Sequence, residues 1–349
     1  MCGIVGIIGT EPVAPTILEA LKRLEYRGYD SAGIATLSGG EIDRRRAEGK
    51  LANLERLLGD TPLEGTIGIG HTRWATHGAP TERNAHPHAT DRVAIVHNGI
   101  IENFRELRER LAAEGATFVT ETDSEVIAHL VTHHLDRGMT PREAAAAAIA
   151  ELEGAFALGI IFRGDEDLMI GARQGSPLAV GYGDEAMYLG SDAFALAPMT
   201  NRVTFLEEGD RVEITRKTAV IHDAEGRIAK RPIKITDVSA ALVDKGNHRH
   251  FMAKEIFEQP EVIGHTLSEY LDTMDNRLAL PSLPVDFSTL SRVTIVACGT
   301  ASYAGHVAKY WFEQLSRLPV EVDIASEFRY RAAPLPDNGR VVFVSQSGE

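Results

Sequence analysis

Short apolar runs and amphipathic segments alternate along the first 240 residues, and this pattern predicts strands and helices in mixed order. Residues 3–9 form a continuous apolar run, typical of a strand buried on both faces. Ile17, Leu18, Leu21 and Leu24 then recur at helical spacing and predict a helix. The same criteria predict strands at 66–70 and 92–96 and helices at 102–113, 123–136 and 140–152.

Two of these helices carry signals for their first turn. Thr122 with Glu125, and Thr140 with Glu143, match the capping box, in which a hydroxyl and a carboxylate three residues apart satisfy the first N–H groups. After residue 152 the pattern predicts short strands separated by turns, at 155–162, 167–172, 186–189, 211–215 and 219–222. Strands, helices and then strands again are typical of a layered α+β domain.

A polar stretch between residues 234 and 250, containing Lys245-Gly246-Asn247, predicts a linker. We therefore expect one domain over residues 1–240, followed over 241–349 by a linker and a second domain. The second domain shows strand patterns at 292–297, 319–325 and 340–344, and a helix after the first of them carries Val307, Tyr310 and Trp311. This order is typical of a parallel α/β sheet.

Composition and charge exclude several classes of protein. The chain has 349 residues, of which 44% are hydrophobic and 25% charged, enough for two cores of ordinary size. A formal net charge of -14 argues against nucleic acid and acidic membranes as partners. Cys2 and Cys298, the only cysteines, predict free thiols in a reducing compartment. With no signal peptide pattern and no membrane-spanning run, we expect a cytoplasmic protein.

Cys2 is the strongest candidate for chemistry. Removal of Met1 would place a thiol and a free α-amine on one carbon, and their pKa values of about 8.5 and about 8 allow the amine to take the thiol's proton. Taken alone, a cysteine at position 2 is more often a small buried residue at the start of a strand. The motifs that follow it in the chain reverse that preference.

Several motifs coincide, in order and spacing, with one family. They are MCGIVG at 1–6, EYRGYDSAG at 25–33, HTRWATHG at 71–78 and HNGIIEN at 97–103, extended by ETDSE at 121–125 and ASEFRYR at 325–331. The chain resembles the glutamine-fructose-6-phosphate aminotransferases. The resemblance implies an αββα N-terminal-nucleophile glutaminase sandwich, followed by the first part of a doubly wound parallel-sheet sugar-isomerase domain. It also implies the conversion of fructose 6-phosphate and glutamine to glucosamine 6-phosphate and glutamate.

Catalytic roles follow from the resemblance residue by residue. Cys2 would attack the glutamine amide and release ammonia through a thioester, with Arg27 supporting its surroundings. Asn98 and Gly99 would donate hydrogen bonds to the oxyanion. Without the resemblance, Asn98-Gly99 would be better explained as a simple turn after a strand.

The same resemblance implies a glutamine site. Arg73 would bind the α-carboxylate with its planar fork, and Asp123 would accept from the α-ammonium group. Trp74, Thr76 and His77 resemble a loop that covers bound glutamine.

Five histidines, His71, His77, His86, His88 and His97, lie close together in the sequence. No cysteine or regularly spaced carboxylate completes a metal ligand set there, so we expect polar walls of a site and no metal. The resemblance calls for no organic cofactor either.

In the second domain, two strand-end loops carry hydroxyl groups suited to phosphate. The resemblance places them around fructose 6-phosphate, although Ala301 stands where many relatives carry serine. The sequence stops before the family's isomerisation residues, so we expect this chain to retain the glutaminase half alone and to form no amino sugar. A homodimer through the isomerase domain is implied for the full-length protein. The loop residues are Cys298, Gly299, Thr300, Ser345, Gln346 and Ser347.

Two alternatives stay open. A related amidotransferase could pass ammonia to a different acceptor, but EYRGYDSAG and the two strand-end loops argue against that. A non-catalytic sugar-phosphate sensor would need no nucleophile, so the complete set of Cys2, Arg73, Asn98 and Asp123 argues against it.

Overall fold

A computed structural model describes residues 2–25, 28–75, 77–236, 248, 250–272, 277–278 and 286–345. The chain divides into two compact units, Met1–Phe251 and Met252–Glu349, and each is considered by itself. The expected boundary near residue 240 and the predicted linker at Lys245-Gly246-Asn247 fall outside the described residues. Within the described ranges, no helix has both the length and the apolar character needed to cross a membrane.

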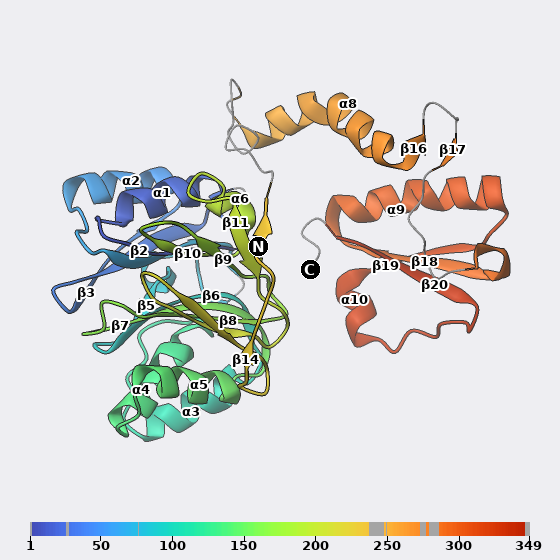
Figure 1. The fold of residues 1–349 in the computed structure, drawn as a ribbon. Coiled ribbons are helices and arrows are strands. Elements are labelled where there is room, and N and C mark those ends of the chain that lie inside the picture. Colours follow the sequence, from blue (N-terminus) through green and yellow to red (C-terminus); the bar gives the residue numbers. More distant parts are fainter. Residues whose placement is uncertain are drawn as a thin grey trace. The chain divides into compact units, whose positions relative to one another are not determined.

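Two antiparallel sheets, lying face to face, form the centre of the first unit (Figure 1). The first sheet has the order β15-β11-β9-β10-β1-β4-β2-β3 and the second the order β14-β13-β12-β8-β7-β6-β5. The first sheet consists of β1 (Gly3–Ile8), β2 (Ser31–Ser38), β3 (Glu41–Glu48), β4 (Ile67–Arg73), β9 (Ala179–Tyr182), β10 (Met187–Gly190), β11 (Arg202–Phe205) and β15 (Lys234–Ile235). The second consists of β5 (His88–Ala89), β6 (Val93–Ile101), β7 (Gly154–Phe162), β8 (Met169–Gln174), β12 (Arg211–Ile214), β13 (Ala219–His222) and β14 (Ile228–Ala229).

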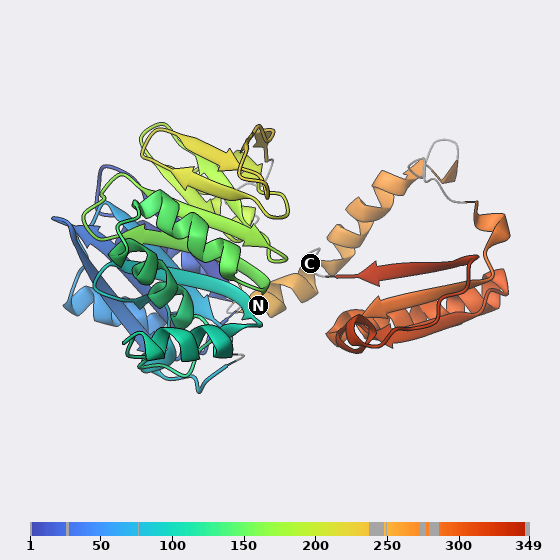
Figure 2. The same ribbon diagram turned by 90° about the horizontal axis from the view of Figure 1, so that it is seen from below.

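Helices cover the outer face of each sheet. The first sheet is covered by α1 (Ala14–Lys22), α2 (Leu51–Asp60) and the short α6 (Ala193–Leu196). The second is covered by α3 (Phe104–Ala113), α4 (Glu125–Asp136) and α5 (Pro141–Glu151), which lie in front of it when the unit is seen from below (Figure 2). The predicted αββα sandwich is confirmed.

The strand β1 shows why its sequence is apolar throughout. Successive side chains of a strand point to opposite faces. Ile4 and Ile8 pack between the two sheets, whereas Val5 and Ile7 pack against the outer helices. Both faces are therefore buried, and the strand needs apolar residues at every position.

The hairpin of β2 and β3 was not predicted. Eight residues of β2 pair with eight of β3, from Ser31 opposite Glu48 to Ser38 opposite Glu41. The strand β3 forms one edge of its sheet and contains three consecutive arginines, Arg44, Arg45 and Arg46. Such a polar edge strand lacks the apolar alternation on which sequence-based prediction depends.

The two predicted capping boxes differ in outcome. Before α5, Thr140 accepts from the N–H of Glu143, and the Glu143 carboxylate accepts from the N–H of Thr140 at 2.9 Å, so this box is confirmed. Before α4, Thr122 Oγ1 does accept from the N–H of Glu125 at 3.3 Å. The second half of that box is wrong, because the Glu125 carboxylate does not return to Thr122.

The Glu125 carboxylate instead holds the turn that leads into α4. It accepts from the N–H groups of Val119 and Thr120 at 2.9 and 2.8 Å. Burial raises the pKa of Glu125, but hydrogen bonds from His129, Val119 and Thr120 outweigh it and bring the pKa to about 2. This turn positions Asp123, two residues before the helix.

The second unit contains a parallel sheet with the strand order β19-β18-β20 among its described residues. In Figure 1, α9 covers one face of this sheet and α10 the other, as in a doubly wound fold. The predicted strand at 292–297 is confirmed, while Val307, Tyr310 and Trp311 of the following helix are exposed. The elements are α8 (Phe251–Tyr270), β16 (Leu271–Asp272), β17 (Arg277–Leu278), β18 (Arg292–Ala297), α9 (Gly299–Trp311), β19 (Val320–Ile324), α10 (Ala325–Tyr330) and β20 (Gly339–Val344), with single turns η3 (Phe287–Thr289) and η4 (Phe312–Ser316).

Candidate functional site

Cys2 lies just before β1, at the end of the sandwich where β4 finishes. The pairing of Gly3 with Thr72 brings Cys2 next to Arg73 and Trp74. The Trp74 N–H donates to Cys2 Sγ, 3.2 Å away. Burial raises the pKa of the Cys2 thiol, and the Trp74 hydrogen bond and the Arg73 charge only partly offset it. The thiol is therefore protonated at neutral pH and needs a base before it can act as a nucleophile.

Asn98 reaches Cys2 from the other sheet. Its Nδ2 donates to the Cys2 carbonyl oxygen at 3.0 Å, a contact between residues 96 positions apart. An amide NH2 carries two hydrogens, so a second N–H is present on the same nitrogen. Asn98 itself is only 8% exposed, so this donor lies in a largely water-free position.

Gly99, next to Asn98, meets two constraints that only glycine satisfies. Its φ is +119°, a value that side chains disfavour. A Cβ atom at this position would lie 1.9 Å from the Ala155 carbonyl oxygen on the neighbouring strand β7. The backbone of Gly99 can therefore take this path only without a side chain.

Arg73 ends β4 and holds the loop that follows it. Its guanidinium donates to the carbonyl oxygens of His77, Gly78 and Ala79, the last at 3.2 Å. Arg73 is 4% exposed and interacts electrostatically with Cys2, Asp30 and Asp123, although burial lowers its pKa. A carboxylate arriving at this guanidinium would share or replace the loop carbonyls, which would couple ligand binding to the loop.

Trp74 and His77 frame this loop through aromatic contacts. The Trp74 ring, 45% exposed, meets Tyr29 edge to face at 5.4 Å between centroids. The His77 ring meets Phe104 in the same way at 5.5 Å. Thr76, the third residue predicted in this loop, lies outside the described residues.

Asp123 is buried beneath the start of α4. One of its oxygens, Oδ2, accepts from the Ile101 N–H at 2.9 Å, and Oδ1 lies 3.4 Å from the Ser124 hydroxyl. Ile101 is the last residue of β6, the strand that also carries Asn98. The fold thus brings Cys2, Arg73, Asn98 and Asp123 to one end of the two sheets.

Two supporting residues were missed from the sequence, although both lie in the EYRGYDSAG motif. Asp30 accepts from the Ala75 N–H at 2.5 Å and so holds the loop just after Trp74. Gly28 lies so close to this loop that a Cβ atom would be 2.6 Å from the Arg73 carbonyl carbon. The signals in the sequence that could have identified them were a charged residue, Asp30, and a glycine, Gly28, inside a family motif. Arg27, the predicted catalytic residue of the motif, lies outside the described residues.

Four of the five clustered histidines form a buried group behind Asn98. The His71 and His86 rings are stacked at 4.1 Å between centroids, and His86 meets His88 at 4.4 Å. Burial lowers the pKa values of His71, His86, His88 and His97, that of His71 to about 3. These imidazoles are neutral at physiological pH.

In the second unit, the two predicted phosphate loops follow adjacent strands. Ala297 pairs with Val344 in parallel, so Cys298 and Ser345 come at neighbouring carboxyl ends. Cys298 precedes α9. Gly299, the first residue of this helix, has a φ of +60°. Cys298, Gly299, Thr300 and Ser345 are all exposed, and Gln346 and Ser347 lie outside the described residues.

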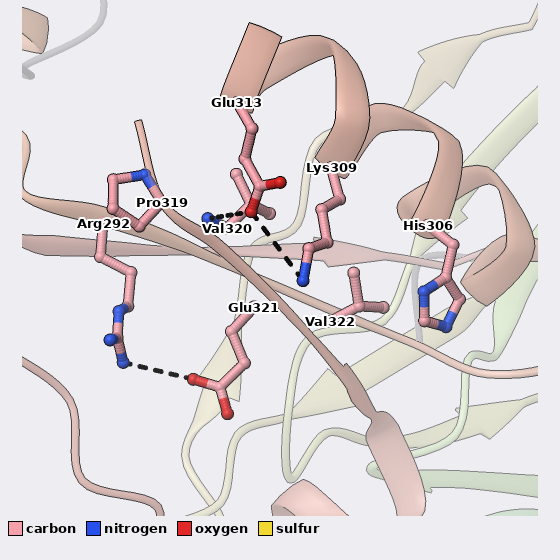
Figure 3. A pocket seen from close by; sticks show the side chains of 8 residues that line it. All are labelled: Arg292, His306, Lys309, Glu313, Pro319, Val320, Glu321 and Val322. Atoms are coloured by element: carbon pink, nitrogen blue, oxygen red, sulfur yellow. Dashed lines mark hydrogen bonds and ion pairs between the residues drawn. The ribbon is translucent and has the colours of Figure 1, made fainter. Parts of the chain in front are cut away.

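A pocket of about 420 Å³ lies elsewhere on the second unit (Figure 3). It is found where β18 and β19 begin, whereas parallel sheets bind ligands beyond the carboxyl ends of their strands. Ion pairs cross it, with Arg292 3.4 Å from Glu321 and Lys309 3.9 Å from Glu313. It is lined by Arg292, His306, Lys309, Glu313, Pro319, Val320, Glu321 and Val322. This pocket is distinct from the predicted sugar site.

Comparisons with known proteins find a matching domain family in each of the two units. Residues 71–198 match the model of a glutamine amidotransferase domain, and residues 287–349 match that of an SIS domain. Over its whole length the chain is 64% identical to a glutamine–fructose-6-phosphate aminotransferase [isomerizing] of Bradyrhizobium diazoefficiens and 61% identical to one of Brucella suis. It spans 58% of the length of each of these relatives.

A similar fold occurs in a solved structure of glutamine phosphoribosylpyrophosphate amidotransferase from B. subtilis. The match covers 92% of this chain and 65% of that chain, with a TM-score of 0.58 and 21% identity. At this identity the likeness concerns the fold alone, and it agrees with the αββα architecture of the first unit.

Proposed function

Because the chain belongs to the family of glutamine–fructose-6-phosphate aminotransferases, we propose that its first unit releases ammonia from glutamine with Cys2 as the nucleophile. One observation carries this proposal. The Asn98 side chain donates from Nδ2 to the Cys2 carbonyl oxygen at 3.0 Å, which places an amide donor at the residue that carries the thiol. An oxyanion formed on attack by the thiol needs such a donor.

The reaction would proceed through two acyl-transfer steps. The thiol proton passes to the α-amine of Cys2, and Sγ attacks the side-chain amide carbon of glutamine. The tetrahedral oxyanion accepts from the free N–H of Asn98 Nδ2 and from the Gly99 N–H. The C–N bond then breaks, the amine returns the proton to the leaving nitrogen, and ammonia departs. Water hydrolyses the thioester to glutamate.

The amine can act as this base only when Cys2 is the first residue, so the proposal includes removal of Met1. The raised pKa of the buried thiol makes an internal base necessary. Intact-mass measurement paired with a glutaminase assay tests this step. Full activity in protein that retains Met1 would contradict the N-terminal base.

Glutamine would be held by opposite charges at the two ionised groups of its α-carbon. The Arg73 guanidinium suits the α-carboxylate and the Asp123 carboxylate suits the α-ammonium group. Trp74, Thr76 and His77 would cover the bound substrate, and Arg27 would support the nucleophile. The support lies in the closeness of Arg73 to both Cys2 and Asp123 and in the loop that Arg73 holds.

For the full-length protein, the proposed acceptor is fructose 6-phosphate, giving glucosamine 6-phosphate. Its phosphate would lie at the start of α9, where backbone N–H groups and the Thr300 hydroxyl are available, near Ser345 and, beyond it, Gln346 and Ser347. Cys298 and Gly299 would line the same loop. A homodimer of the full-length protein through its isomerase domain and a cytoplasmic location complete the proposal.

A paired experiment tests both halves. Glutamate and ammonia are measured for the chain and for Cys2→Ala, which should be inactive, and an electrophilic glutamine analogue should label Cys2 while Cys298 stays unmodified in the peptide map. Ammonia release that survives Cys2→Ala would contradict the mechanism.

Calorimetric titration with fructose 6-phosphate tests the proposed sugar site. Thr300→Val should bind fructose 6-phosphate more weakly than the unsubstituted chain. Equal binding by the variant and the unsubstituted chain would contradict the phosphate site.

A further inference from the structure

A buried imidazole lies directly behind the Asn98 side chain. His71, on β4, is fully buried, and its Nε2 lies 3.0 Å from Asn98 Oδ1 and 3.0 Å from the His97 carbonyl oxygen. Asn98 therefore has His71 at its oxygen and Cys2 at its nitrogen. His71 and Asn98 come from different sheets, so this contact also joins the two layers.

The His97 carbonyl decides which nitrogen of His71 carries the proton. A carbonyl oxygen only accepts, so Nε2 must be the protonated nitrogen of the neutral ring. The other nitrogen, Nδ1, has no hydrogen-bond partner among the described residues. With its hydrogen on Nε2, the ring can face only an acceptor on Asn98, which is Oδ1.

The surroundings keep this ring neutral and fixed. Burial lowers the pKa of His71 to about 3, although the hydrogen bonds to Asn98 and to the His97 carbonyl oppose this shift. The ring is stacked on His86 at 4.1 Å with 29° between their planes. His97 is held in turn by the Ser124 hydroxyl, 2.8 Å from its Nδ1.

We propose that His71 is a positioning residue for glutamine hydrolysis, which orients the Asn98 amide through its Nε2–H so that the amide NH2 faces Cys2 and the oxyanion. If the amide were reversed, Oδ1 would face the Cys2 carbonyl and the oxyanion, and two oxygens would repel each other. The inference rests on the proposed function, because it assigns a further residue to the same reaction.

Two substitutions distinguish the effect of the His71 N–H donor from the effect of the volume that its side chain fills. His71→Leu fills the space without a donor, and kcat should fall about 10- to 100-fold, less than on direct loss of an oxyanion donor. KM for glutamine should stay within about threefold, because Arg73 and Asp123 keep their contacts. His71→Gln carries an amide N–H near the position of Nε2 and should restore kcat to within about tenfold of the unsubstituted chain.

A double-mutant cycle with Asn98→Ala shows whether His71 acts through Asn98. Once Asn98 is gone, His71→Leu should lower kcat by less than about twofold further. A full additive loss would overturn the inference. His134 is a matched control, because it is another buried histidine, with Nε2 2.8 Å from Glu151 on the far side of the second sheet. An equal loss of kcat in His134→Leu would also overturn it.

Two further measurements keep the inference separate from the function. If the unsubstituted chain hydrolyses glutamine and Cys2→Ala does not, the proposed function stands whatever His71→Leu shows. Nitrogen-15 spectra of histidine-labelled protein, with His71 assigned from His71→Gln, should show the neutral Nε2–H form from pH 8 to pH 5. A proton on Nδ1 or titration of His71 within that range would overturn the inference without reference to activity.

Discussion

At the residue scale, the environment of Cys2 sets what the proposed reaction requires. Burial raises the pKa of the thiol, so proximity to Arg73 does not suffice to form a thiolate at neutral pH. The nucleophile therefore depends on a separate base, and the oxyanion depends on donors that are already in place. In the proposed mechanism Asn98 supplies one such donor, and its hydrogen bond to the Cys2 carbonyl oxygen fixes its side chain.

Asn98→Ala should lower kcat for glutamine hydrolysis by about 10²- to 10³-fold, the usual effect of losing one oxyanion donor. KM should change little, because Asn98 binds charge that develops only in the transition state. Steady-state kinetics with glutamate detection test this. A raised KM with unchanged kcat would show instead that Asn98 binds the ground-state substrate.

Arg73→Lys should give the opposite pattern. A single ammonium cannot replace the planar fork that binds a carboxylate in two places, so KM for glutamine should rise more than kcat falls. The loop should loosen as well, because the guanidinium donates to the carbonyls of His77, Gly78 and Ala79. The same kinetics, with limited proteolysis of the loop as a second readout, decide the matter. An unchanged KM would remove Arg73 from the substrate site.

At the scale of single elements, the strand β6 contributes side chains to two hydrophobic cores and to the candidate site. Val93 and Ile95 face the helices, whereas Ala94 and Val96 face the other sheet. This alternation continues past the apolar residues, so that Asn98 falls on the side of the other sheet and reaches Cys2. A shift of the register by one residue would turn Asn98 away from Cys2.

Gly99→Ala should destabilise the first unit far more than Gly115→Ala. Both glycines have positive φ, +119° and +101°, so both variants carry a backbone penalty of about 1–2 kcal/mol. Only at Gly99 would the new Cβ meet another strand, 1.9 Å from Ala155 O, whereas nothing lies within 4 Å at Gly115. β6 and β7 must then separate locally.

Urea unfolding followed by Trp74 fluorescence measures this difference, in a Trp311→Phe background so that the signal comes from the first unit. The Gly99→Ala midpoint should lie clearly below that of Gly115→Ala. Equal midpoints would show that the β6 and β7 backbones adjust to the methyl group without cost.

At the scale of the whole first unit, the layered fold buries several ionisable groups in neutral form. His71, His86, His88 and His97 all have pKa values lowered by burial. In the unfolded chain these imidazoles titrate near pH 6.5. Below that pH the unfolded chain binds protons that the folded unit does not take up.

Stability should therefore fall with pH from about 6.5 downward, toward the pKa of about 3 given for His71. The sign follows from linkage, because stability rises with pH wherever the unfolded state holds more protons. Four such groups would cost up to about 4 kcal/mol between pH 6.5 and 5.5. Urea midpoints at pH 7.5, 6.5 and 5.5 measure the slope, which His71→Gln should reduce by about one proton. A constant midpoint over this range would contradict the neutral cluster.

Much of the fold was accessible from the sequence, because strands and helices follow local periodicity. The strand at 219–222 and the capped helix from Pro141 were predicted close to their observed bounds. The polar edge strand β3 was not, because its environment, and not an apolar pattern, makes it a strand. Motif spacing likewise pointed to Cys2 and Asn98 but gave no role to Asp30 or His71.

Sequence alone determined which residues are proposed to carry the chemistry, because Cys2, Arg73, Asn98 and Asp123 stand in motifs that local order and residue type reveal. Tertiary structure alone decided how they meet. The contact between Asn98 and Cys2 spans 96 residues and depends on the stacking of two sheets. The direction of the Asn98 amide depends on the proton of His71, which a carbonyl on the second sheet fixes. Such long-range contacts are set by strand register and layer packing, and neither is encoded in any local segment.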